Sequence, residues 1–167
     1  MGKIEIRPET PADRDAIYGI TTDAFRGKPY ADGDEQDVIN RLRDCDALSL
    51  SLVATQGNNV VGQITFSPAT AEDGSGPWYA LGPVSVQPER QGEGIGAALI
   101  KAGLDDIAER GALGCILTGN PDYYRRFDFE VMPDHAPLRE PGEFFMLKCL
   151  HGEAPAGRFE FHPAFYA

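Results

Sequence analysis

The sequence predicts an α/β protein. Segments with the two-residue period of strands alternate with segments that have the three-to-four-residue period of helices. An apolar strand runs directly into a glycine-rich loop that opens a helix. No linker divides the 167 residues, and 42% of them are hydrophobic, so we expect residues 1–167 to form a single domain with its own core.

The first part of the chain is expected to hold a short strand, two helices and a strand pair. Thr10 is placed as an N-cap before Pro11, and apolar residues then recur every three or four positions from Ala16 to Phe25. Leucines alternate with serines from Leu48 to Leu52, which predicts a half-buried strand. The expected elements are strand Ile4–Arg7, a helix after Thr10, a break at Gly27–Gly33, helix Glu35–Arg43, strand Leu48–Val53, turn Gln56–Asn59 and strand Val60–Phe66.

The second part begins with Ser67–Pro77, which contains Gly and Pro and few apolar residues. This composition predicts an exposed loop. The elements expected after it are strand Trp78–Val86, helix Gly94–Arg110, strand Leu113–Leu117, a short helix capped by Asn120 or Asp122 that holds Tyr123 and Tyr124, and strands Phe144–Leu150 and Arg158–His162.

Gly92, Gly94 and Gly96 lie at the junction between strand Trp78–Val86 and the following helix. Glycine lets the backbone adopt positive φ angles and approach a ligand closely. The free N–H groups and the macrodipole at a helix N-terminus both favour an anion. The junction therefore predicts a site for a phosphorylated ligand.

Two common phosphate-binding loops do not fit this junction. A P-loop needs Lys and Ser or Thr after its last glycine, and here Ala97 and Ala98 follow Gly96. A dinucleotide fingerprint is matched nominally by Gly92, Gly94 and Ala97, but it also needs an acidic residue at the end of the next strand. That strand ends in Thr118-Gly119-Asn120, so the partner for a ribose is missing.

A third pattern, [QR]-x-x-G-x-[GA], is matched by Gln91, Gly94 and Gly96. Tyr123–Phe129 is similar to the Y-x-x-x-G-F segment that follows the next strand in the same family. At these residues the chain resembles the GNAT family of acyl-CoA-dependent N-acyltransferases, over roughly Lys3–Leu150. Its last segment resembles the YhbS-like subgroup. The resemblance implies the GNAT fold: a central, mostly antiparallel mixed sheet flanked by helices, with one splayed pair of strands.

The resemblance also implies an N-acetyltransferase that uses acetyl-CoA as co-substrate, with no metal, and transfers the acetyl group by direct attack of a primary amine. The acceptor would be a small molecule or a protein. Pro83 suits the disrupted ladder of the splayed strand, because proline cannot donate a ladder hydrogen bond. The implied cofactor-binding residues are Val84, Ser85 and Val86 for the pantetheine arm, Gln91, Gly92, Glu93, Gly94, Ile95, Gly96 and Ala97 for the pyrophosphate, and Asn120 for the arm or as a helix cap.

Tyr124 is the candidate general acid. A tyrosine hydroxyl has a reference pKa of about 10, so it can protonate a departing thiolate and regain its proton from solvent. Tyr123 is the alternative, and both tyrosines could simply pack the short helix onto the sheet. Tyr124 is favoured because it lies four residues before Asp128, where the family has Gly. Asp tolerates left-handed backbone geometry, so we expect the turn to survive.

The general base is less evident from the sequence. Glu35, at the start of the second helix, is the leading candidate, with a solvated charge as the alternative. Glu72 and Asp73 are placed on the expected exposed loop, where they would attract a cationic substrate. His135, His151 and His162 belong to no recognisable motif, and structural or surface roles are expected for them.

The net charge of −11 argues against a nucleic-acid partner, because binding to a phosphate backbone needs a basic surface. An acidic surface would instead attract a cationic amine. The same charge opposes the polyanionic coenzyme, so backbone amides and nearby cations must bind it locally. The cations near the two motifs are Arg90, Lys101, Arg125 and Arg126.

No apolar run suggests a membrane span and the amino terminus lacks a signal-peptide pattern, so a cytoplasmic protein is expected. Cys45, Cys115 and Cys149 are widely spaced and are expected to be small buried residues rather than disulfide or metal ligands. A non-catalytic acyl-CoA-binding sensor or scaffold is the alternative function, and the presence of both the loop and Tyr124 favours the enzyme. The oligomeric state is left open, with a homodimer as one option.

Overall fold

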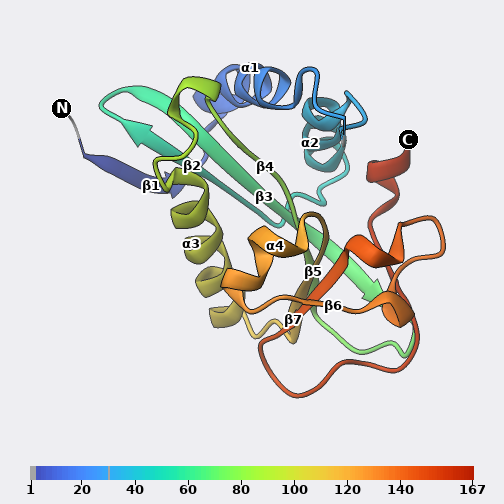
Figure 1. The fold of residues 1–167 in the computed structure, drawn as a ribbon. Coiled ribbons are helices and arrows are strands. Elements are labelled where there is room, and N and C mark those ends of the chain that lie inside the picture. Colours follow the sequence, from blue (N-terminus) through green and yellow to red (C-terminus); the bar gives the residue numbers. More distant parts are fainter. Residues whose placement is uncertain (1–2, 30) are drawn as a thin grey trace. The chain divides into compact units, whose positions relative to one another are not determined.

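The computed structural model describes residues 3–29 and 31–167 (Figure 1). The chain forms two compact units: unit 1 comprises Met1–Phe66 and Gly82–Gly103, and unit 2 comprises Ser67–Leu81 and Leu104–Ala167. Strands β3 (Asn59–Ala71) and β4 (Trp78–Val86) and helix α3 (Ile95–Glu109) each run from one unit into the other. The single domain expected from the sequence stays a prediction. No helix in the described ranges has the length and apolar character needed to cross a membrane.

Unit 1 contains four strands or parts of strands in the order β1-β2-β3-β4. Strand β2 is antiparallel to both of its neighbours, β1 and β3. Helices α1 and α2 lie together beside these strands (Figure 1). The elements that belong wholly to unit 1 are β1 (Ile4–Pro8), α1 (Arg14–Phe25), α2 (Glu35–Asp44) and β2 (Leu50–Gln56).

A short 3-10 turn, Pro11–Asp13, precedes α1, and Thr10 is its N-cap as predicted. The Asp13 carboxylate accepts the backbone N–H of Thr10 at 2.7 Å and receives two hydrogen bonds from Arg7, at 2.7 and 3.0 Å. The hydrogen bond from Arg7 is the main cause that lowers the pKa of buried Asp13 to about 2. The start of the first helix is therefore closed by the chain's own carboxylate.

Strand β2 is buried on both faces, so the expectation of a half-buried strand is wrong. Val53 packs with Ile17 of α1 and Ile39 of α2, while its neighbours Leu52 and Ala54 are also buried. Helix α3 covers the opposite face of the sheet: a Cβ at Gly62 would meet Ile95 and Leu99 at 3.1 and 3.2 Å. Ser51, a serine of the alternating pattern, is small enough to be enclosed when helices cover both faces, whereas Ser49 precedes β2 and is half-buried.

Unit 2 contains the end of β3 and the start of β4 together with four further strands. β4 is parallel to β5, from Trp78↔Gly114 to Ala80↔Ile116, whereas β5, β6 and β7 pair antiparallel and β8 pairs with β3. The mostly antiparallel mixed sheet is confirmed. The elements that belong wholly to unit 2 are β5 (Gly114–Thr118), α4 (Pro121–Tyr124), β6 (Glu130–Val131), β7 (Phe145–Cys149) and β8 (Phe159–Glu160).

The expected loop over Ser67–Pro77 is half wrong, because β3 continues to Ala71. Its small residues Ala69 and Ala71 are buried in the aromatic core of unit 2, where Trp78 meets Phe159 edge to face at 5.0 Å. The low apolar content of this segment was typical of a loop. In the structure its small side chains are the ones that fit beside the large aromatic rings of the core. The expected strand at Arg158–His162 shortens to β8, and the two-residue β6 was not predicted.

Only one cysteine matches the expectation of burial. Cys115 is buried in β5, whereas Cys45 and Cys149 are exposed. Cys45 is the C-cap of α2 and Cys149 is the last residue of β7, so both lie at the end of an element rather than within the core. All three histidines have structural roles as expected. A ring nitrogen of His135 and one of His151 each contact a backbone carbonyl, at 2.7 and 2.8 Å, and Nδ1 of His162 accepts the Ala164 N–H at 3.0 Å.

Candidate active site

The loop between β4 and α3, in unit 1, has the geometry of an anion site. Gly92 and Gly94 both have φ of +85°, a conformation that favours glycine, and nothing lies within 4 Å of a Cβ built on either residue. The first helical hydrogen bond runs from the Ala98 N–H to the Gly94 carbonyl at 3.0 Å. The amides of the first turn, Ile95–Ala97, therefore have no acceptor within the helix.

Glu93 is the acidic residue between the two left-handed glycines of this loop, and its carboxylate is bound by Arg90. The guanidinium Nε of Arg90 lies 3.0 and 3.2 Å from the two Glu93 oxygens. Its Nη1 donates to the Gln56 side-chain oxygen, at the end of β2, at 2.8 Å. Gln91, the first residue of the predicted motif, donates from its side chain to the Val86 carbonyl at 3.3 Å. Both side chains thus tie the loop to neighbouring strands.

The end of β4 holds Val84, Ser85 and Val86, which were assigned to the pantetheine arm. Val84 and Val86 are half-buried, whereas Ser85 is buried with its hydroxyl 2.9 Å from that of Thr21 in α1. The Ser85 side chain thus faces α1, so only its backbone is available to a ligand on the other side.

A buried polar network behind β4 was not anticipated from the sequence. Gln63 Nε2 donates to Ser85 Oγ at 2.6 Å and to the Pro83 carbonyl at 3.2 Å, and Thr65 donates to the same carbonyl at 3.0 Å. Side chains thus donate two hydrogen bonds to the Pro83 carbonyl. The disrupted ladder expected at this proline stays a prediction. The available signal was the presence of two polar residues in the otherwise apolar strand Val60–Phe66.

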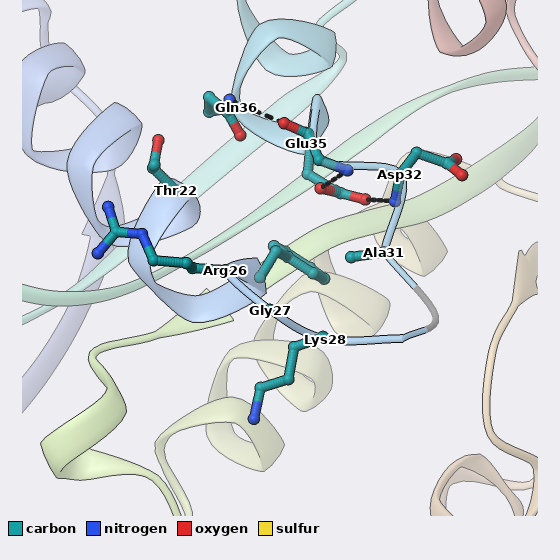
Figure 2. A pocket seen from close by; sticks show the side chains of 10 residues that line it. Thr22, Arg26, Gly27, Lys28, Ala31, Asp32, Glu35 and Gln36 are labelled. Atoms are coloured by element: carbon teal, nitrogen blue, oxygen red, sulfur yellow. Dashed lines mark hydrogen bonds between the residues drawn. The ribbon is translucent and has the colours of Figure 1, made fainter.

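Glu35, the candidate base, lines a pocket of about 350 Å³ formed by the end of α1, the following loop and the start of α2. Its two oxygens accept the backbone N–H groups of Asp32, at 2.8 Å, and Gly33, at 3.2 Å. Figure 2 shows Glu35 and Asp32 on one side of this pocket and the cationic side chains of Arg26 and Lys28 extending from the other. Glu35 therefore stabilises the loop before α2 by hydrogen bonds and also lines the pocket.

Asp32, Asp34 and Glu35 bring three carboxylates within 4.8 Å of one another. Asp34 forms an ion pair with Arg41 at 2.9 Å, and Glu35 is bound by the two amides of its loop. Protein donors already stabilise two of these three carboxylates, and nothing in their geometry requires a cation.

The remaining site residues, Asn120 and Tyr124, belong to unit 2. The Asn120 side-chain oxygen accepts the Asp122 N–H at 3.0 Å, so Asn120 is the N-cap of α4. The half-buried Tyr124 ring packs against Gly119, where a Cβ would approach it to 2.8 Å, and lies edge to face with Phe129 at 6.0 Å. Glycine at 119 thus makes the space that the tyrosine ring occupies.

The neighbouring Tyr123 has different surroundings. The Arg126 guanidinium lies 4.5 Å from the centre of its ring, and burial raises the pKa of the Tyr123 hydroxyl. Asp128 ends the segment with φ of +68° and ψ of +26°, so the left-handed turn predicted for this position is confirmed.

Of the cations expected near the motifs, two are paired within unit 2. Arg125 forms an exposed ion pair with Asp122 at 3.6 Å, and Arg126 donates to the Tyr123 carbonyl at 3.0 Å. Lys101 is exposed on α3, and Arg90 binds Glu93. An anion bound at this loop of unit 1 would therefore rely chiefly on backbone amides.

Comparison with known families identifies this arrangement. The family model of the acetyltransferase (GNAT) domain matches residues 5–132. The chain belongs to the GNAT family. Its predicted membership, including the similarity to YhbS, is confirmed: YhbS, an uncharacterised N-acetyltransferase of Escherichia coli K12, is 31% identical over 96% of this chain and 97% of its own length.

Two solved GNAT structures superpose on nearly the whole chain. A GNAT acetyltransferase of Brucella melitensis in complex with acetyl-CoA is 39% identical, with a TM-score of 0.88 and 99% of each chain covered. E. coli YhbS in complex with CoA has a TM-score of 0.90 and covers 100% of this chain and 94% of its own, at 26% identity in that superposition. The GNAT fold predicted from the loop motif is thereby confirmed.

Proposed function

We propose that this GNAT protein transfers the acetyl group of acetyl-CoA to a primary amine. The observation that carries the proposal is the open start of α3, where two left-handed glycines and the first-turn amides leave room for an anion. The acetyl-CoA and CoA bound in the Brucella and E. coli relatives support this choice of ligand.

The residues of unit 1 fit the donor in two places. The amides of Ile95, Gly96 and Ala97 would hold the pyrophosphate, with Gln91, Gly92, Glu93 and Gly94 shaping the loop around it. The backbone of Val84, Ser85 and Val86 would pair with the pantetheine arm, and Asn120 of unit 2 would contribute an amide to the arm. When bound, acetyl-CoA supplies an acetyl thioester.

Tyr124 is proposed to donate its hydroxyl proton to the departing sulfur as the carbon–sulfur bond breaks. Its place supports this role, because the ring is fixed by Gly119 and by neighbouring aromatic side chains while remaining half-buried. Glu35 is proposed to accept the proton that the amine nitrogen loses when it bonds to the acetyl carbon. To do so it must exchange one of its two amide hydrogen bonds for the amine.

The acceptor is proposed to be a cationic small molecule or a protein amine. The net charge of −11 favours the approach of a cation over that of an anion, with an on-rate that falls as salt rises. In the pocket beside α2, Asp32 and Glu35 contribute negative charge on the side opposite Arg26 and Lys28 (Figure 2), so the amine is proposed to bind on the side of the two carboxylates.

Tyr124→Phe tests the proposal in an assay of CoA release across a panel of primary amines. Removing the general acid should lower kcat by about 100-fold and leave KM for acetyl-CoA unchanged. Tyr123→Phe is the matched control, because it removes the same group from the adjacent ring. The Tyr123 hydroxyl has no role in the proposed reaction, so this variant should retain turnover.

Wild-type turnover with no amine of the panel, together with calorimetric binding of CoA, would instead favour the non-catalytic sensor. Absence of CoA binding would contradict both functions. Full activity of Tyr124→Phe would remove Tyr124 from the mechanism without affecting the proposed reaction.

A further inference from the structure

The proposed pyrophosphate loop carries a charge of the wrong sign. Glu93 lies between Gly92 and Gly94, the two residues with φ of +85°, and is the only charged residue from Gln91 to Ala97. A free carboxylate at this position would repel a pyrophosphate that approaches the same loop. Its effect therefore depends on what neutralises it.

Arg90 supplies that neutralisation and also fixes where the carboxylate lies. Its Nε contacts both Glu93 oxygens, while Nη1 reaches the Gln56 side chain at 2.8 Å. The Arg90 side chain is 23% exposed, against 46% for Glu93, so the guanidinium is the more enclosed member of the pair. A three-part contact of this kind restricts both the loop and the carboxylate.

The backbone beneath Arg90 is anchored to the same hairpin. The Arg90 N–H donates to the Gln87 carbonyl at 2.8 Å, and the Gln87 N–H donates to the Val61 carbonyl of β3 at 2.9 Å. Gln56 ends β2 and pairs with Asn59 at the start of β3. Arg90 is thus tied to the β2–β3 hairpin in two ways. Its side chain contacts Gln56 directly, and its backbone is linked to Val61 through Gln87.

The geometry points to Arg90 as a positioning residue that neutralises Glu93 and holds its carboxylate toward Gln56, leaving the amides of α3 free for the pyrophosphate. This inference rests on the proposed function, because it concerns the same loop. It differs from direct phosphate binding by Arg90, in which the guanidinium would leave Glu93 and contact the ligand.

A double-variant cycle measured by calorimetric titration with CoA tests the inference. Arg90→Ala should weaken CoA binding about tenfold, because Glu93 is then left as an unpaired charge in the loop. Arg90→Ala combined with Glu93→Gln should bind within about threefold of wild type, since the charge that needed neutralising is gone. Glu93→Gln alone should bind at least as tightly as wild type.

Arg110→Ala is the matched control. It also removes an arginine that pairs with an acid of α3, Asp106, at 2.6 Å, but at the opposite end of the helix. It makes the same change in net charge and should alter CoA affinity by less than about twofold. The defect of Arg90→Ala should also shrink at high salt, which screens a repulsion between exposed charges but not a loss of packing.

Two results would overturn the inference while wild-type CoA binding keeps the proposed function intact. If the double variant binds as weakly as Arg90→Ala, Arg90 acts on the ligand or on loop packing rather than through Glu93. If Arg90→Ala binds like wild type, the contact with Glu93 has no role. A wild-type protein that does not bind CoA would overturn both the inference and the proposed function.

Discussion

Helices α2 and α3 both begin in unit 1 after a loop that contains glycine, yet their N-termini are built in opposite ways. The first turn of α2 carries Glu35 and Asp37, and the Glu35 carboxylate accepts the amides of Asp32 and Gly33. The first turn of α3 has no acidic residue, and open space lies above Gly92 and Gly94. The one carboxylate next to it, that of Glu93, is bound by Arg90.

The difference shows how a general property of helices becomes a specific site. Every helix N-terminus favours a negative charge, through its free amides and its macrodipole. Where the chain places its own carboxylate there, that preference stabilises the fold. Where the chain provides glycine and no carboxylate, the free amides and the macrodipole remain available to bind an anionic ligand.

Ala97→Asp would abolish the difference by giving α3 a carboxylate at its third position. The new side chain can reach back to the backbone N–H of Gly94, as an acidic residue at this position does in a capping box, and it places a negative charge beside the first-turn amides. We expect CoA affinity to fall by at least about 100-fold, with thermal stability unchanged or raised. Calorimetric titration and a thermal melt measure the two effects.

Ala97→Asn is the neutral control of almost the same size, and it should lose far less affinity. Equal losses for Ala97→Asp and Ala97→Asn would mean that space rather than charge decides binding at α3.

Asp13 extends the comparison to the start of α1, which is closed by a carboxylate. Asp13→Asn should lower the free energy of unfolding by about 2 kcal/mol at neutral pH, because the folded-state pKa of Asp13 lies near 2 rather than at its ordinary value of 3.8. A lowered folded-state pKa stabilises the fold above the ordinary value. That contribution is lost as pH falls from about 4 to about 2.

Denaturant titrations of wild type and Asp13→Asn across this pH range should therefore converge at the acidic end. Asp15→Asn removes an exposed carboxylate two residues away and should change stability by less than about 0.5 kcal/mol. A constant difference between wild type and Asp13→Asn at all pH values would contradict the assigned pairing with Arg7.

Glu35 allows the smallest test, in the first turn of α2, where its carboxylate binds two amides of the preceding loop. Glu35→Ala should lower the free energy of unfolding by about 1 kcal/mol, because the amides of Asp32 and Gly33 lose their acceptor. Glu35→Gln keeps one acceptor oxygen and should lose less stability. If Glu35 is also the base, Glu35→Gln will lower kcat at least about tenfold with KM for acetyl-CoA unchanged.

Denaturant titration and steady-state kinetics separate these two roles. Wild-type turnover in Glu35→Gln would leave Glu35 as a residue that closes its loop and would exclude it as the base.

Local chemistry explains which features could be predicted. Thr10 and Pro11 mark the start of a helix, glycines mark the β4–α3 junction, and Asp128 tolerates the left-handed turn, because each effect depends on a few adjacent residues. The misplaced strand end depends on distant partners. Thr70 and Ala71 belong to a strand because Glu160 and Phe159 pair with them from far along the chain. The exposure of Cys45 is a local effect, since Cys45 is the C-cap of α2.

The sequence by itself determined the family, the fold class and the position of the glycine loop proposed to bind phosphate, since these depend on ordered motifs and on the periodicity of apolar residues. The tertiary structure decided which carboxylates are neutralised and by what. Gln56 and Arg90 are 34 residues apart, and Thr21 and Ser85 are 64 apart, yet each pair is joined by a hydrogen bond. Such contacts form only when the tertiary fold brings distant segments together, so no local pattern in the sequence predicts them.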